Sequence, residues 1–121
     1  MMMKRVFSLL TLLFGFGAQA QINSLHIRDF AADPPKKMIL LDVRTAQEYK
    51  EGHLPKSMNI DWLQSSFATK AAKLPKNQPV YVYCRSGKRS ASAAKWLMDQ
   101  GFDVINLSGG VMDLSAKQLV K

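Results

Sequence analysis

The sequence of 121 residues contains a single cysteine, Cys84, and only two histidines. One thiol excludes an internal disulfide, and one cysteine with two histidines at unrelated positions provides no metal-ligand cluster. We therefore expect neither a metal nor any other cofactor. The sequence also lacks internal repeats, low-complexity tracts and long linkers. These absences indicate one domain with a single modest core.

Acidic residues are scarce, with 9 Asp and Glu against 17 Lys and Arg, so the formal net charge is +8. Most of the lysines are scattered as solvated surface lysines usually are, and only Arg85, Lys88 and Arg89 cluster beside a reactive side chain. The run Arg-Ser-Gly-Lys-Arg is short and lacks interleaved aromatic residues, which argues against a nucleic-acid patch. We expect a basic soluble surface and no nucleic-acid partner.

The first twenty residues have the pattern of a cleavable signal peptide. Lys4 and Arg5 form the basic region, residues 6–17 are apolar, and Ala18-Gln19-Ala20 is the small-x-small pattern that a signal peptidase cleaves. An apolar stretch of about twelve residues is too short to cross a bilayer, which disfavours the alternative of an uncleaved anchor. We expect residues 1–20 to be removed, and the domain of residues 21–121 to be periplasmic, monomeric and without a stable membrane anchor.

The rest of the sequence alternates between strand and helix patterns. Apolar, β-branched and aromatic runs predict strands at residues 37–43, 57–60, 79–83 and 103–107. Helices are predicted at 25–32, at 46–51 after a capping box of Thr45 and Glu48, at about 68–74 after Ser65 or Ser66, at 88–100, and from 109–110 toward 118. The helix at 88–100 is expected to bury Ala91, Ala94, Leu97 and Met98. This alternation predicts an α/β fold of three layers, with a mainly parallel central sheet and helices on both faces.

Cys84 lies where the strand of residues 79–83 turns into the helix that follows. Amides at such a turn point inward, bind anions, and favour the thiolate over the thiol. A lower pKa makes the thiolate more abundant but less nucleophilic, so the net gain in reactivity is only a few-fold. The cations Arg85, Lys88 and Arg89 are therefore expected to act mainly on a charged substrate and its departing anion. This pattern predicts a sulfur nucleophile that reacts with a small anion.

Three segments of the sequence resemble the motifs of rhodanese domains. Residues 41–55, which read Leu-Asp-Val-Arg-Thr-Ala-Gln-Glu-Tyr-Lys-Glu-Gly-His-Leu-Pro, with Asn59-Ile60 following, are similar to the upstream motif. Residues 83–90 resemble the active-site loop, and residues 107–110 resemble the downstream glycine motif. The match spans nearly all of residues 21–121, and its size and leader are most like the small exported rhodaneses of the phage shock protein E type. The sequence departs from the family at Leu114, where many members carry tryptophan. This difference affects the expected packing of the last helix and not the chemistry of the loop.

The resemblance implies the rhodanese fold and a thiosulfate sulfurtransferase that works through two displacements. Cys84 would be the catalytic nucleophile that takes the outer sulfur of thiosulfate as a persulfide, and cyanide or a thiol would then accept that sulfur. The substrate-binding residues would be those of the loop: Arg85, Ser86, Gly87, Lys88, Arg89 and Ser90. No general base is required.

Several other residues allow both a functional and a structural interpretation. Asp42 and Arg44 could steer charge at the edge of the sheet, but a buried pair that ties a strand to its loop is favoured. His53 is interpreted as a structural histidine, and Trp62 and Trp96 as packing residues. Ser90 is expected to cap the helix.

Two other functions use the same kind of residues. A cysteine-dependent phosphatase or arsenate reductase also has a cysteine in an anion-binding loop, but the phosphatase signature places arginine six residues after the cysteine, where Ser90 stands. Tyr83 also replaces the histidine that usually precedes that cysteine. A sulfur carrier that holds a persulfide for a partner without turnover would have the same residues as the enzyme, so only turnover separates these two.

Overall fold

The computed structural model describes residues 21–121 of the chain. The predicted signal peptide, residues 1–20, lies outside the described residues. Within the described part, no helix has the length and apolar character needed to cross a membrane.

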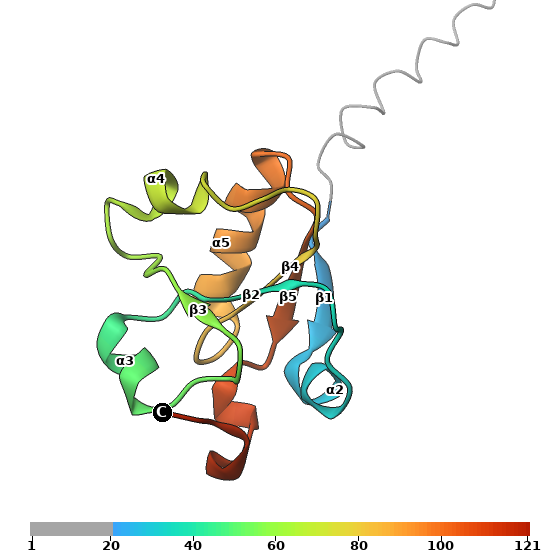
Figure 1. Ribbon diagram of the computed structural model, residues 1–121, viewed down its shortest axis with the longest axis vertical. Helices are drawn as coiled ribbons and strands as arrows, with labels where there is room; N and C mark the ends of the chain where they lie inside the picture. Colours follow the sequence, from blue (N-terminus) through green and yellow to red (C-terminus); the bar gives the residue numbers. More distant parts are fainter. Residues whose placement is uncertain (1–20) are drawn as a thin grey trace, which may run out of the picture.

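Five parallel strands form the central sheet, in the order β1-β5-β4-β2-β3 (Figure 1). They are β1 (Asn23–His26), β2 (Ile39–Asp42), β3 (Met58–Asn59), β4 (Val80–Tyr83) and β5 (Val104–Ser108). Because β4 lies in the middle, the loop that follows it has a strand end on each side, a position where ligands gather in parallel sheets. The α/β fold class predicted from the sequence is confirmed.

Within residues 21–121, four α-helices and two 3₁₀ turns connect and follow the strands. The α-helices are α2 (Ile27–Ala32), α3 (Ala46–Glu51), α4 (Phe67–Ala71) and α5 (Lys88–Asp99), and the 3₁₀ turns are η2 (Val111–Asp113) and η3 (Ala116–Gln118). The capping box predicted for α3 is present, because Thr45 and Glu48 bond each other's backbone amides.

Neighbouring residues of each strand point to opposite faces of the sheet, which gives two cores instead of the single core predicted from the sequence. Leu41 and Val82 pack with the buried face of α5, whereas Leu40 and Tyr83 pack with Ile27 and Phe30 of α2. The first core is the larger, since α5 is the longest of the described helices and aromatic side chains around Phe67 extend this core. Cys84 belongs to this α5 core.

The start of the described chain differs from the prediction. Residues 25–32 were predicted as one helix, but Asn23–His26 pair with β5 as an edge strand and α2 begins only at Ile27. The first three residues of β1 are exposed, so the segment lacks the apolar alternation that reveals a half-buried strand.

The end of the chain also differs, because the helix predicted from Gly109-Gly110 toward Gln118 is replaced by η2 and η3. The amides of Val111 and Met112 bond the carbonyls of Cys84 and Arg85 rather than a helical partner. Ser115 has an extended backbone and caps η3, which interrupts any continuous helix. The last residues then turn back, and Val120 forms an antiparallel bridge with His53, which brings the C-terminus beside α3 (Figure 1).

Two predictions about the helices were wrong. Ser66 has a helical backbone and makes no side-chain capping bond, and α4 ends at Ala71 rather than near Leu74. In α5 the fully buried positions are Ser90, Ala93, Ala94 and Leu97, while Ala91 and Met98 are only partly buried. The apolar face of α5 is therefore rotated by about one residue from the predicted one.

Candidate active site

The sulfur of Cys84 lies at the bottom of a turn between the end of β4 and the start of α5. The backbone amides of Gly87 and Ser90 donate hydrogen bonds to Sγ, at 3.1 Å and 3.3 Å. Gly87 has a φ of +97°, a left-handed conformation that suits glycine, and it lets the loop close around the sulfur. Cys84 is only 1% exposed, so its sulfur is enclosed by donors rather than by water.

These donors shift the pKa of Cys84. Burial of the thiol acts to raise the pKa, but the Ser90 hydroxyl and the amides of Ser90, Ser86 and Gly87 outweigh it, and the pKa lies below its ordinary value. The Ser90 Oγ atom is buried and has no well-formed hydrogen bond among the described residues, which leaves its hydroxyl group available to the sulfur. The site therefore stabilises a thiolate.

The segment after β5 supports the loop from outside. Val111 and Met112 donate backbone hydrogen bonds to the carbonyls of Cys84 and Arg85, each at 3.0 Å. Gly110 has a φ of +66°, and a Cβ atom at this position would overlap the Arg85 carbonyl group. The close approach of the two backbones thus depends on the absence of a side chain at Gly110.

We expect the substitution Gly110→Ala to destabilise the protein by at least about 2 kcal/mol, because it combines left-handed strain with a backbone overlap. The overlap should also displace the backbone of Arg85. Gly101→Ala is the matched control: Gly101 also has a positive φ, of +95°, but its nearest new neighbour would be the flexible end of Lys76. Urea unfolding of both variants measures the difference. Equal losses in the two variants would contradict a role for the contact between Gly110 and Arg85.

The three cations of the loop occupy different environments. Arg85 and Lys88 are exposed, and Arg85 lines a cavity of about 310 Å³ beside the loop, together with Glu48, Glu51 and Met112. Arg89 is instead held by Glu48 through two hydrogen bonds of 2.8 Å and 2.9 Å. Arg85 and Lys88 are therefore the cations of the loop that have no ion-pair partner among residues 21–121.

The pair of Glu48 and Arg89 predicts a pH dependence of stability. The hydrogen bond from Arg89 lowers the pKa of Glu48 from 4.5 to about 2. A lowered pKa in the folded state means that the pair stabilises the protein fully above pH 4.5 and that this contribution is lost as the pH falls toward 2. Glu48→Gln should therefore cost about 1 to 3 kcal/mol at pH 6 and progressively less below pH 4.5.

Urea unfolding between pH 6 and pH 3 tests this prediction. Glutamine retains the capping role at this position, so the substitution isolates the ion pair. Glu51→Gln is the control, because Glu51 is exposed and bonds only the neutral Gln47 side chain. A pH-independent cost of Glu48→Gln would argue against the ion pair as its cause.

Asp42 and Arg44 form a buried ion pair, as the structural interpretation predicted. Arg44 donates to both carboxylate oxygens of Asp42, with the shortest bond at 2.7 Å, and also to the Gly52 carbonyl. Burial would lower the pKa of Arg44, but the contacts with Asp42 raise it instead. The pair ties the end of β2 to Gly52 at the end of α3.

The other residues with two interpretations have structural contacts. His53 stacks on Tyr49 at 3.7 Å between ring centroids and bonds its carbonyl. Trp62 and Trp96 pack edge-on against Phe67. Ser90 does not cap α5, because Gly87 occupies the N-cap position and the Ser90 side chain is buried. No group of three metal-ligating side chains occurs among residues 21–121.

Sequence reasoning missed three contacts that hold the site together. The sequence predicted Glu48 only as a capping residue, although its side chain also binds Arg89. Asp113 lies near His26 and Arg28, at 3.1 Å and 3.7 Å, and so links η2 to the first elements of the chain. The Tyr83 hydroxyl accepts a hydrogen bond from the Leu54 amide, which joins the residue before Cys84 to the segment after α3. None of these pairs is close in sequence.

Comparisons with known proteins match the part of the chain that contains this site. The model of the rhodanese-like domain family matches residues 27–117. A sulfurtransferase of Allochromatium vinosum is 33% identical over 93 residues, which are 76% of this chain and 84% of that protein. The thiosulfate sulfurtransferase GlpE of Pseudomonas savastanoi is 41% identical over 73 residues, 60% of this chain and 67% of that protein.

Solved structures show the same fold. The crystal structure of a rhodanese-related protein from Thermoplasma volcanium has a TM-score of 0.72 and 27% identity, and the match covers 81% of this chain and 97% of that one. The family match spans the loop of Cys84, the strands on both sides of it and the glycine pair that supports it. The chain belongs to the rhodanese-like domain family and is related to its sulfurtransferases.

Proposed function

We propose that the protein is a thiosulfate sulfurtransferase that carries sulfur on Cys84. The observation that carries this proposal is the enclosed sulfur of Cys84, which accepts two backbone hydrogen bonds and has a lowered pKa. A lowered pKa favours the thiolate, which is the nucleophilic form of cysteine, and so supports an attack that needs no general base. Two exposed cations, Arg85 and Lys88, follow Cys84 in the sequence.

The reaction consists of two displacements at sulfur. The Cys84 thiolate attacks the outer sulfur of thiosulfate, a sulfur–sulfur bond forms, and the bond to the sulfonate breaks as sulfite leaves with its electron pair. The terminal sulfur of the resulting persulfide carries the negative charge that the loop amides stabilise. Cyanide or a thiolate then attacks that sulfur, and the Cys84 thiolate is regenerated.

Arg85 is assigned to the sulfonate end of thiosulfate. A charge-assisted hydrogen bond contributes about 1.5 to 3 kcal/mol, so Arg85→Ala should raise the KM for thiosulfate by about tenfold or more. The effect on kcat should be smaller, because sulfite retains the charge that Arg85 binds. Lys95→Ala is the control, since Lys95 is exposed on α5 and pairs with Asp99. Equal KM values for both variants would remove Arg85 from the binding site.

The decisive experiment is the intact mass of the protein after brief exposure to thiosulfate. We expect a gain of one sulfur atom, which cyanide then removes with formation of thiocyanate. Continued thiocyanate production identifies an enzyme, whereas a single loading without turnover identifies a sulfur carrier. A folded protein that gains no sulfur would refute the thiosulfate proposal, and release of phosphate from an aryl phosphate would favour the phosphatase.

The site of action is a further part of the proposal. We infer from Lys4, Arg5 and the Ala18-Gln19-Ala20 motif that the protein is exported to the periplasm and acts there. The intact mass of protein from a periplasmic extract tests this, with Gln21 as the expected first residue. A mass that retains residues 1–20 would contradict cleavage at this position.

A further inference from the structure

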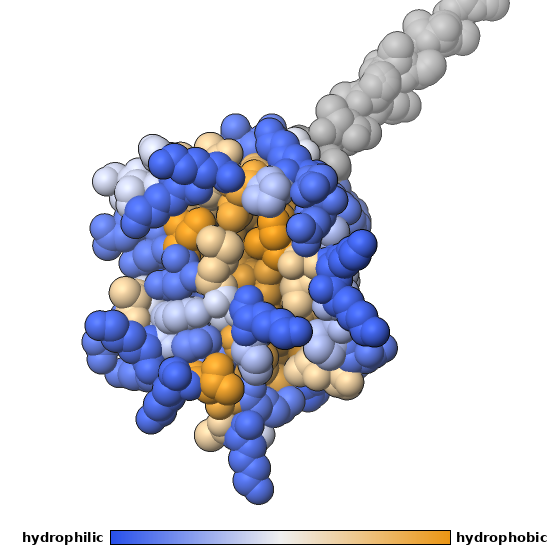
Figure 2. All heavy atoms as spheres, in the orientation of Figure 1, coloured by the Kyte–Doolittle hydropathy of each residue, from blue (hydrophilic) through white to orange (hydrophobic). Residues whose placement is uncertain are grey.

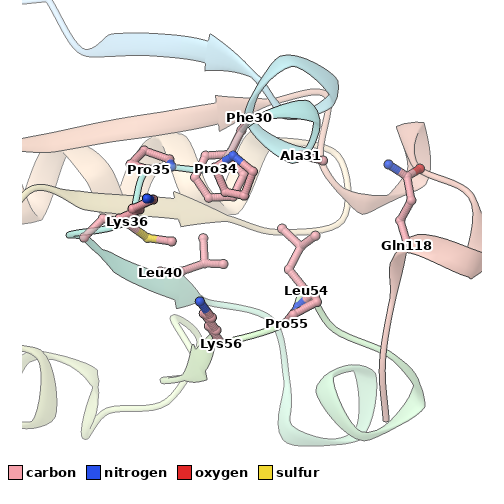
Figure 3. A pocket seen from close by; sticks show the side chains of 11 residues that line it. Phe30, Ala31, Pro34, Pro35, Lys36, Leu40, Leu54, Pro55, Lys56 and Gln118 are labelled. Carbon is pink, nitrogen blue, oxygen red and sulfur yellow. The ribbon is translucent and has the colours of Figure 1, made fainter.

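A second cavity lies on the α2 side of the sheet, away from the loop of Cys84. It has a volume of about 300 Å³, and its apolar wall includes Phe30 of α2, Leu40 of β2 and Leu54 of the segment after α3. Figure 3 shows Leu40 and Leu54 pointing into the space, which Phe30 and Pro34 close from the opposite side. No residue of the loop 84–90 or of the supporting segment 109–112 lines it. The cavity is therefore separate from the proposed active site.

The cavity exists because α2 is short and covers only part of the sheet. This helix ends at Ala32, and Pro34 and Pro35 then lead the chain along the edge of the cavity instead of across it. Figure 2 shows hydrophobic atoms at the surface in the middle of this view, between hydrophilic margins. An apolar cavity of this kind attracts apolar ligand atoms rather than water. Its volume is at the lower end of the range of about 300 to 1,000 Å³ for ligand pockets, so its ligand is small.

The charged residues at the cavity have one sign. Lys36 and Lys56 line it, and no carboxylate does. Neither lysine has an ion-pair partner among the residues that the structure describes. Both are exposed, and in Figure 3 they lie at the margin of the apolar space near Leu40. An anionic group at this margin would meet two cations without displacing an existing partner.

The backbone at Lys56 is strained in a way that glycine would relieve. Its φ is +69°, and it is the only residue other than glycine with a positive φ between 21 and 121. The turn is closed by hydrogen bonds from the amide and hydroxyl of Ser57 to the Leu54 carbonyl. A lysine in this conformation points to a use for its side chain.

We propose that this cavity binds a small amphiphile with one anionic group, such as a medium-chain carboxylate. The apolar part lies against Phe30, Leu40 and Leu54, and the anionic group meets Lys36 and Lys56. The proposal does not depend on sulfur transfer, because it uses none of the residues of the Cys84 loop.

The test is a titration of the protein with octanoate, followed by NMR shifts of the leucine methyl groups. We expect saturable shifts at Leu40 and Leu54. Octylammonium has the same chain with the opposite charge and should bind at least about fivefold more weakly, since two exposed charge contacts become repulsive. The double variant K36Q/K56Q should bind octanoate about three- to tenfold more weakly than the wild type.

K70Q/K73Q is the matched control, because it removes two exposed lysines that do not line the cavity. Its octanoate affinity should equal that of the wild type, and unchanged thermal melting of both variants shows that the fold is retained. The absence of saturable shifts, equal binding of octylammonium, or equal losses in the two double variants would overturn the proposal. Shifts that appear only with anionic lipid vesicles, and not with octanoate, would replace it with a membrane contact.

Discussion

Replacement of Cys84 by serine is expected to abolish sulfur transfer and to leave the fold intact. A serine hydroxyl is not ionised near neutral pH and forms no stable bond to a sulfane sulfur, so both displacements lose their nucleophile. We expect the rate to fall by at least about 10⁴-fold, as it does when other enzymes lose their nucleophile. Thiosulfate:cyanide turnover and the intact mass after thiosulfate treatment measure this loss.

Stability should change much less than activity. Serine is similar in size to cysteine and accepts the same hydrogen bonds from the amides of Gly87 and Ser90. We therefore expect a change of less than about 1.5 kcal/mol in the free energy of unfolding. Ser92→Ala, an exposed substitution on the same helix, is the control for both measurements. Turnover that survives in Cys84→Ser would reveal another nucleophile and refute the assignment, since Cys84 is the only thiol of the chain.

The parts of the site that local patterns encode were predicted correctly. The apolar run before Cys84 and the helix formers after Gly87 are close in sequence. In the structure, Cys84 directly follows β4, and α5 begins at Lys88. The capping box of Thr45 and Glu48 also spans only three residues. In both cases the pattern and the structure it determines lie within the same few residues.

The parts that were missed depend on contacts between distant segments. Glu48 and Arg89 are 41 residues apart, and nothing near either residue indicates the other. β1 is an edge strand with exposed side chains, so only its backbone pairing with β5 defines it. The last helix was predicted to start at Gly109-Gly110, but bonds from Val111 and Met112 to the carbonyls of the Cys84 loop replace helical ones. Tertiary contacts therefore override the local preference there.

The substitution Asp42→Ala is expected to destabilise the protein by about 3 to 5 kcal/mol, because it leaves the Arg44 guanidinium buried without its counterion. The side chains of Asp42 and Arg44 are 0% and 6% exposed, so water does not compensate for the lost carboxylate. Small domains are stable by only about 5 to 15 kcal/mol, and the variant should therefore be at least partly unfolded at 37 °C. Urea unfolding at 25 °C measures the loss.

The double variant D42L/R44M separates the two interpretations of this pair. Removing both charges leaves no buried ion, so the double variant should be more stable than Asp42→Ala by at least about 2 kcal/mol. If the pair only holds the end of β2 to the Gly52 carbonyl, the double variant should retain most of its thiosulfate turnover once it is folded. If the pair instead steers charge at the site, turnover should fall even though stability returns. A double variant no more stable than Asp42→Ala would show that the pair contributes through its hydrogen bonds, which apolar side chains cannot replace, and not through the cost of an isolated charge.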